Sequence, residues 1–230
     1  MKTFKIIGLL LSYPKEDMQI HVDELIETVS EEKLVPRAVE RNLLEFMDKL
    51  ANRNLLEIQE EYVATFDRSR GHSLYLFEHI HGESRDRGQA MVDLIGHYKS
   101  RGLELNVREL PDYLPMFLEF LSLCNPKEAQ ELLGEVVHII AAVGAKLKAK
   151  GNDYHIVFKA LASLTKAEIN KDFVKQALAE DAARDDSFEA LDKEWEDTPA
   201  FDGTGAVDCG TCPSAMPRPG VSPEISNVKH

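Results

Sequence analysis

The chain has 230 residues and a formal net charge of −13, and hydrophobic residues make up 43% of it. This length is sufficient for a buried core, and the negative charge argues against binding DNA, RNA or an anionic membrane surface through bulk electrostatics. The 3 cysteines are too few for a disulfide scaffold and fit a reducing compartment.

The beginning of the chain contains a short apolar run that looks like the start of a signal peptide. This run, residues 6–11, contains a glycine and is followed by Pro14 and charged residues instead of a small-residue cleavage site. It is also far shorter than a membrane-spanning segment. We therefore predict a first core helix with Thr3 as its N-cap and Pro14 ending it, and we expect a cytoplasmic protein.

Apolar residues recur with helical spacing along most of the chain up to residue 180, for example in residues 39–50 and 132–147. Asn125 and Pro126 are typical of the first positions of a helix, and Asp153 is predicted to cap another helix. No long run of strict alternation indicates a strand. The sequence therefore predicts an all-α fold with roughly eight to ten helices.

Charge and composition divide the chain into three parts. Residues 1–180 form the predicted single globular multi-helix domain. Residues 181–200 are predicted to be acidic and partly helical, since the segment 180–200 carries nine acidic and two basic side chains. Residues 201–230 contain four prolines and four glycines. We expect a disordered tail there, because this composition cannot bury enough surface to offset the entropy of ordering.

The stretch from Phe66 to Gly88 breaks the helical pattern. Glycines punctuate two charged turns, and a short apolar helix is predicted between them over residues 74–80. In a helical protein, such an interruption favours a functional site. The arginines of these turns are candidates for binding an anion, but neighbouring carboxylates favour surface ion pairs instead. These arginines are Arg68, Arg70, Arg85 and Arg87.

Sequence patterns for metal binding or catalysis are weak. Four histidines lie within residues 72–97, but their spacing does not bring three ligands to one point, so no metal site is predicted. Glu78 and His81 are expected to share a charge-assisted hydrogen bond. Phosphate-binding and nucleophile motifs are not found, so no enzyme is predicted. Cys209 and Cys212 form a CxxC pair, for which metal contact and regulation both stay open.

Apolar residues beside the charged turns are compatible with a binding groove. They lie in residues 74–80 and 113–117, and the second group follows Asp112, a predicted N-cap that places Pro115 in the first helical turn. An apolar groove bordered by carboxylates is suited to an amphipathic, basic peptide helix. The alternative is that these residues are core, which is at least as common for any single apolar residue.

Two motifs, residues 76–94 and residues 108–115, closely resemble the NarJ proteins. These are the delta-subunit chaperones of respiratory nitrate reductase, within the wider TorD/DmsD group of redox enzyme maturation proteins. The similarity runs over residues 3–197. It implies an all-helical cytoplasmic chaperone that binds the N-terminus of the catalytic (alpha) subunit, a vestigial twin-arginine-like leader. It also implies that the apo subunit is held while the molybdenum cofactor and an iron–sulfur cluster are inserted, and that docking to the membrane anchor subunit is delayed.

The resemblance further implies which residues bind the peptide. A Pro-x-Asp-His motif is implicated in leader binding in the wider group, and it corresponds here to Pro111, Asp112 and Tyr113, with tyrosine where many relatives have histidine. We therefore expect the peptide to lie near residues 66–87 and 111–117. The predicted peptide-binding residues are Phe66, Leu74, Leu76, Phe77, Glu78, His81, Glu83, Pro111, Asp112, Tyr113 and Met116.

The same resemblance sets the expected cofactors and partners. No cofactor is expected to be bound stably, because the molybdenum cofactor is delivered to the client. The expected partners are the nitrate reductase alpha subunit and molybdenum cofactor biosynthesis proteins, with no nucleic acid and no membrane insertion. The alternative function is a nucleotide or cofactor carrier that acts through the arginine-rich turns, as guanosine nucleotide binding has been suggested for some relatives.

Overall fold

The computed structural model of the chain describes residues 1–80, 85–103 and 109–183. Within these residues the chain forms ten α-helices, and its only ladder-type contact is an isolated bridge between Tyr75 and Tyr113. The predicted all-α fold is therefore confirmed. The α-helices are α1 (Lys2–Leu10), α2 (Glu16–Ile20), α3 (Val22–Glu32), α4 (Arg37–Ala51), α5 (Leu55–Tyr62), α6 (Arg85–Ser100), α7 (Leu114–Leu123), α8 (Pro126–Ala149), α9 (His155–Ala162) and α10 (Lys171–Ala183).

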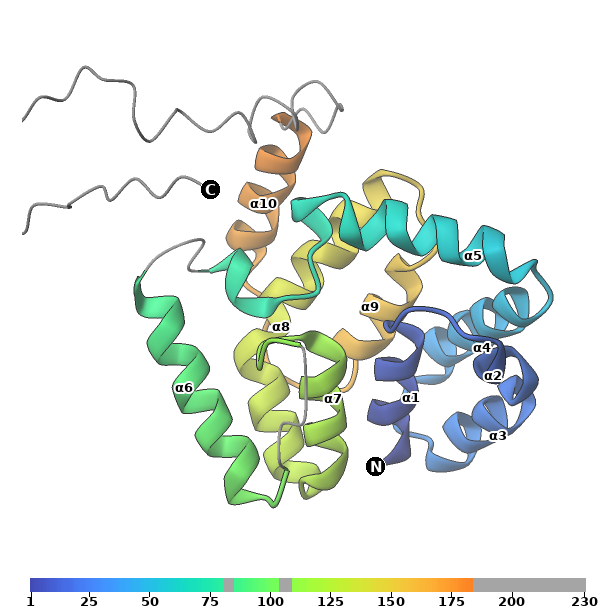
Figure 1. Ribbon diagram of the computed structural model, residues 1–230, viewed down its shortest axis with the longest axis horizontal. Helices are drawn as coiled ribbons and strands as arrows, with labels where there is room; N and C mark the ends of the chain where they lie inside the picture. Colours follow the sequence, from blue (N-terminus) through green and yellow to red (C-terminus); the bar gives the residue numbers. More distant parts are fainter. Residues whose placement is uncertain (81–84, 104–108, 184–230) are drawn as a thin grey trace, which may run out of the picture. The chain divides into compact units, whose positions relative to one another are not determined.

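The helices pack in a multi-helix domain around the long helix α8 (Figure 1). Helices α9 and α10 pack on α8, while α1 packs on both α3 and α7, and α4 packs on α3 and α9. One core joins these layers, because a fully buried apolar side chain from each of five helices belongs to it. These residues are Ile7, Leu43, Leu118, Ile140 and Leu161.

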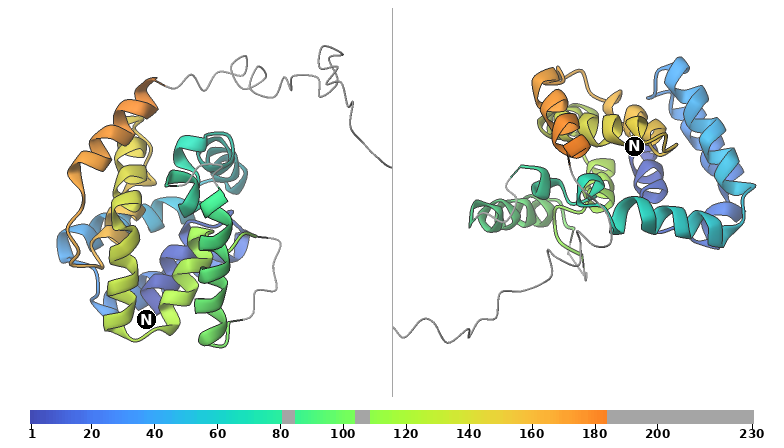
Figure 2. Two further views of the ribbon diagram at one scale, coloured as in Figure 1. Left: turned by 90° about the vertical axis from the view of Figure 1, so that its left-hand side faces the viewer. Right: turned by 90° about the horizontal axis from the view of Figure 1, so that it is seen from above.

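Helix α6 lies at the left-hand edge of the helical domain in Figure 1 and in the right-hand view of Figure 2. Its main anchor is Tyr98, which is fully buried and packs in a tilted arrangement against the ring of Phe120. The Tyr98 hydroxyl donates a hydrogen bond of 2.7 Å to the carbonyl oxygen of Pro111. The anchor therefore connects α6 to the turn that precedes α7.

Two of the predicted helix signals are confirmed in detail. Helix α8 begins at Pro126, and the side chain of Asn125 accepts a hydrogen bond of 3.0 Å from the backbone N–H of Glu128. In α4, the apolar stripe that predicted the helix faces inward. Its buried residues are Leu43, Phe46, Met47 and Leu50. In both helices, local sequence and tertiary packing favour the same structure.

Two predicted N-caps are wrong. Helix α1 begins at Lys2 and ends at Leu10, before Pro14, and Thr3 lies inside its first turn. The Thr3 N–H and hydroxyl instead donate hydrogen bonds of 2.7 Å to the Glu32 carboxylate. Asp153 pairs with Lys49 instead of capping α9. The N–H of Tyr154, just before α9, donates a hydrogen bond to the side-chain oxygen of Asn152. Thr3 and Asp153 therefore bind tertiary partners, and neither side chain caps a helix.

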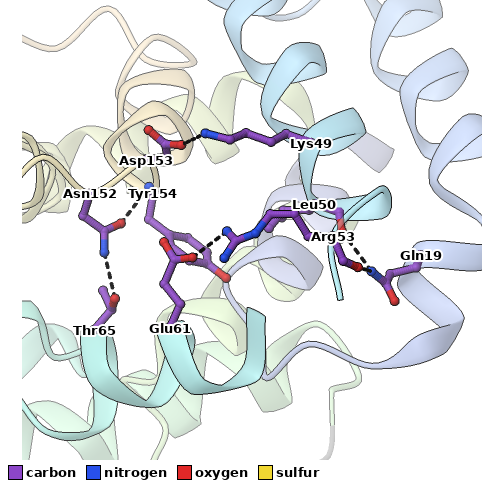
Figure 3. Close-up of polar contacts among 9 residues, drawn as sticks. All are labelled: Gln19, Lys49, Leu50, Arg53, Glu61, Thr65, Asn152, Asp153 and Tyr154. Atoms are coloured by element: carbon purple, nitrogen blue, oxygen red, sulfur yellow. Dashed lines mark hydrogen bonds and ion pairs between the residues drawn. The ribbon is translucent and has the colours of Figure 1, made fainter. Parts of the chain in front are cut away.

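Polar contacts hold α9 and α2 to the junction of α4 and α5 (Figure 3). Arg53, between α4 and α5, pairs with Glu61 at 2.6 Å. The carbonyl of Arg53 also accepts a hydrogen bond of 2.9 Å from the Gln19 amide. The Asn152 amide donates to the Thr65 hydroxyl at 2.8 Å. These contacts order the end of α5 and the turn that follows, where the candidate site begins.

The C-terminal predictions fall mostly outside the described residues. Residues 181–183 continue α10, whereas the rest of the acidic segment 181–200 and the tail 201–230 are not described. Among the helices of residues 1–80, 85–103 and 109–183, none is both long and apolar enough to cross a membrane.

Candidate functional site

The interrupted stretch predicted as functional is held against the start of α7. It contains a π-helical turn η1 (Val63–Asp67) and two 3₁₀ turns, η2 (Arg70–His72) and η3 (Leu76–His79). The N–H of Leu76 donates to the Asp112 carbonyl at 3.0 Å, and the N–H of Leu114 donates to the Leu74 carbonyl at 2.8 Å. The apolar helix predicted over residues 74–80 is therefore one 3₁₀ turn after a short extended segment.

Asp112 positions this stretch instead of capping α7. Helix α7 begins at Leu114, with Pro115 in its first turn as predicted and without a side-chain cap. The Asp112 carboxylate is fully buried and accepts a hydrogen bond of 3.0 Å from the N–H of Phe77. Burial raises the pKa of Asp112, although the Phe77 N–H and Arg87 act to lower it. The predicted N-cap role of Asp112 is therefore wrong, and its carboxylate links η3 to α7.

The predicted peptide-binding residues separate into a buried and a partly exposed group. Phe66, Leu74, Leu76, Pro111 and Asp112 are buried, whereas the side chains of the other described members reach the surface in part. The partly exposed members are Phe77, Glu78, Tyr113 and Met116.

His81 and Glu83 lie outside the described residues, and so does the predicted hydrogen bond between Glu78 and His81. Glu78 instead pairs with Arg87 at 3.3 Å, and Arg87 lies 3.8 Å from the Asp112 carboxylate. Arg87 therefore belongs to an ion-pair network with carboxylates, as the charge pattern predicts for the arginine turns.

An apolar groove of about 620 Å³ runs along α1 between α3 and α7. Along α1, its wall follows one helical stripe, from Lys2 through Ile6 and Leu9 to Ser12 just beyond the helix. Gly8 lets α1 and α7 approach closely, because a Cβ at this position would lie 3.1 Å from the carbonyl oxygen of Pro115. The groove is lined by Lys2, Lys5, Ile6, Gly8, Leu9, Ser12, Leu25, Thr28, Glu109, Tyr113, Pro115, Met116 and Glu119.

The predicted peptide-binding residues lie on one wall of this groove and not on the other. Tyr113 and Met116 were predicted as binding residues, but the residues of α1 and α3 were not. Leu9 belongs to the apolar run of residues 6–11, yet in the structure it lines the groove and is 41% exposed. The spacing of the apolar run predicts a helix, but it does not reveal that α3 and α7 leave part of this helix uncovered.

Charged residues border the apolar groove at both ends. Lys5 of α1 pairs with Glu119 of α7 at 3.2 Å. At the other end, the Tyr75 hydroxyl donates a hydrogen bond of 2.7 Å to the Glu109 carboxylate. Burial raises the pKa of Tyr113 there, and the negative charge of Glu109 raises it further. The Tyr113 hydroxyl is therefore neutral, and it lies 3.5 Å from the hydroxyl of Tyr62.

A second, polar pocket of about 560 Å³ lies between η2, η3, α8 and α10. Burial lowers the pKa of His72 and of His79, and each ring contacts a backbone carbonyl, that of Thr65 and of Ser73 respectively. These histidines are thus neutral structural residues. The side chains of the pocket are those of Arg70, Glu78, His79, Ile80, Arg87, Ala142, Lys146, Phe173, Gln176, Ala177, Glu180 and Asp181, beside Gly71. In the described part of the chain, no three His, Cys, Asp or Glu side chains gather as metal ligands.

The described residues thus form an all-helical domain with an open apolar groove between α1, α3 and α7. The model of the nitrate reductase delta subunit family matches residues 32–159, and the chain belongs to this family. It is 42% identical to the nitrate reductase molybdenum cofactor assembly chaperone NarJ of Escherichia coli K12, over 84% of this chain and 81% of that protein.

Two further relatives carry similar names. The probable assembly chaperone NarW of the same strain is 42% identical, over 93% of this chain and 89% of its own. The probable NarJ of Bacillus subtilis is 27% identical, over 70% of this chain and 89% of its own. The resemblance inferred from residues 76–94 and 108–115 is therefore confirmed. The relatives are named as assembly chaperones and not as enzymes.

Proposed function

We propose that this chain is a cytoplasmic chaperone of nitrate reductase assembly that binds the N-terminal, leader-like segment of the apo catalytic subunit in the apolar groove. While the segment is bound, the client receives its molybdenum cofactor and iron–sulfur cluster, and its docking to the membrane anchor subunit is delayed. The relatives named as assembly chaperones support this role. The observation that carries the proposal is the apolar groove along α1, which is open to a partner helix.

Binding in the groove would rest mainly on apolar contact. Leu9, Leu25 and Met116 present apolar surface, and burial of such surface contributes about 25 cal/mol per Å². The client must also be released, so we expect a dissociation constant between about 1 μM and 1 nM. Tyr113 and Met116 would contact the client directly. The buried residues Leu74, Leu76 and Asp112 would support this wall from behind.

The test compares two exposed leucines, one inside the groove and one outside it. Leu9 lines the groove and is 41% exposed, whereas Leu56 on α5 lies outside the groove and is 67% exposed. Calorimetry with a synthetic peptide of the catalytic subunit's N-terminus should show Leu9→Glu weakening binding about tenfold or more, because its carboxylate would be desolvated. Leu56→Glu should bind as the wild type does. Equal affinities of the two variants would contradict the proposed site.

A nucleotide or cofactor carrier is the second candidate, and the polar pocket is the observation that favours it. Arg70, Arg87 and Lys146 line this pocket, although Arg87 also pairs with Glu78. A ligand that binds only the native state raises the melting temperature. A rise with GTP or with molybdenum cofactor, but none with the peptide, would favour the carrier. A rise in melting temperature with the peptide alone would favour the chaperone. Separately, co-purification with molybdenum cofactor biosynthesis proteins would identify further partners.

A further inference from the structure

We propose that the groove has a direction: the client helix lies antiparallel to α1, with its N-terminus beside Glu109 and its C-terminus beside Lys2. This inference rests on the proposed function, since it assigns the orientation of the helix in the same groove. It follows from the different charges that the fold places at the two ends.

The two ends of the groove are the two ends of α1. Lys2 lies in the first turn of this helix and Ser12 lies just beyond its last residue, Leu10. At 1.5 Å per residue, the stripe from Lys2 to Ser12 is about 15 Å long, which matches about three turns of a client helix. Helix α7 runs the opposite way along the groove, because Glu119 contacts Lys5 while Tyr113 contacts Ser12.

The Ser12 end is acidic. Glu109 lines it and is held by the hydrogen bond from the Tyr75 hydroxyl. A second carboxylate, Asp67, lies close enough that burial and the charge of Glu109 together raise the pKa of Asp67. Both side chains are exposed to solvent and are accessible to a partner. An α-ammonium group, a basic side chain and the positive end of a helix dipole are all favoured beside them.

The Lys2 end has the opposite character. Lys2 and Lys5 line it, and Thr28 of α3 lies across from them. The two carboxylates at this end are already engaged. Glu119 contacts Lys5 at 3.2 Å, and Glu32 accepts hydrogen bonds from the backbone N–H groups of Lys2 and Thr3. The C-terminus of a helix carries unpaired carbonyls and a partial negative charge, so lysines stabilise it. Both ends thus favour one direction of the client.

The middle of the groove does not select a direction. Ile6, Leu9 and Met116 are apolar there, and apolar contact depends little on which way a helix runs. Affinity would therefore come mostly from the middle, whereas orientation would come from the ends. Affinity and orientation can therefore be tested separately, the first by binding measurements and the second by crosslinking.

The experiment uses the full chain and the same synthetic peptide of the catalytic subunit's N-terminus, with a benzophenone side chain placed near either end. After irradiation, the N-terminal label should attach near Ser12, Glu109 and Tyr113, and the C-terminal label near Lys2 and Thr28. Glu109→Gln should weaken binding about fivefold, since a charge contact is lost. The control Glu168→Gln removes an exposed carboxylate outside the groove and should not weaken binding.

The outcomes distinguish this inference from the proposed function. If the peptide binds and Leu9→Glu weakens it, but the labels attach in the reverse pattern or equally at both ends, the direction is wrong while the function stands. An affinity that Glu109→Gln leaves unchanged also overturns the direction. A peptide that does not bind, or that binds independently of Leu9, overturns both.

Discussion

Replacing Asp112 with alanine should destabilise the protein, because this carboxylate is the acceptor for the N–H of Phe77. Leaving a backbone N–H without an acceptor costs about 1–3 kcal/mol. The contact with Arg87 at 3.8 Å adds little, since Arg87 keeps Glu78 as a nearer partner at 3.3 Å. We therefore expect Asp112→Ala to lower the free energy of unfolding by about 2 kcal/mol.

The assay is urea denaturation followed by circular dichroism. With a denaturant slope of about 2 kcal/mol per M, the midpoint for Asp112→Ala should fall by about 1 M. Asp112→Asn keeps an acceptor for the Phe77 N–H and should lose less than half as much. The control Asp93→Ala removes an exposed carboxylate from α6 and should change stability by less than about 0.5 kcal/mol. Wild-type stability of Asp112→Ala would refute the positioning role.

The pH dependence gives a second measurement of the same residue. Burial raises the pKa of Asp112, so the native state binds its proton more tightly than the unfolded state does. The contribution of this group to stability is therefore greatest at low pH, and it decreases as the pH rises from the unfolded pKa through the raised native pKa. Asp112→Asn should remove this decrease. A variant that retains the wild-type pH slope would show that the carboxylate titrates normally.

Two further predictions concern contacts between helices. Burial opposes the charge of Glu32, but hydrogen bonds from Thr3 and Lys2 outweigh it and lower the Glu32 pKa. Glu32→Gln should cost about 1 kcal/mol at pH 7 in urea denaturation, and this difference should vanish as the pH falls through the lowered pKa. Gly71→Ala should lower the melting temperature by several degrees, since its Cβ would overlap the buried Asp181 carboxylate, which pairs with Lys150. An unchanged melting temperature would contradict the close packing of η2 on α10.

Where local signals agreed with tertiary packing, the sequence predicted the structure well. Asn125 and Pro126 mark the start of α8, and the stripe of α4 faces the core. The N-cap predictions for Thr3, Asp112 and Asp153 are wrong, because residue type alone does not show which tertiary partners a short polar side chain will meet. In the fold these three residues bind Glu32, the Phe77 N–H and Lys49.

By itself, the sequence determined the all-helical class, the inward faces of the long helices and the family, because 3.6-residue periodicity and long motifs are properties of consecutive residues. Only the tertiary structure decided which apolar residues are left uncovered. Leu74 and Leu76 are buried while Leu9 lies in an open groove, although all three belong to apolar runs. Periodicity specifies a face of a helix, whereas its exposure depends on helices distant in the chain, here α3 and α7 on either side of α1.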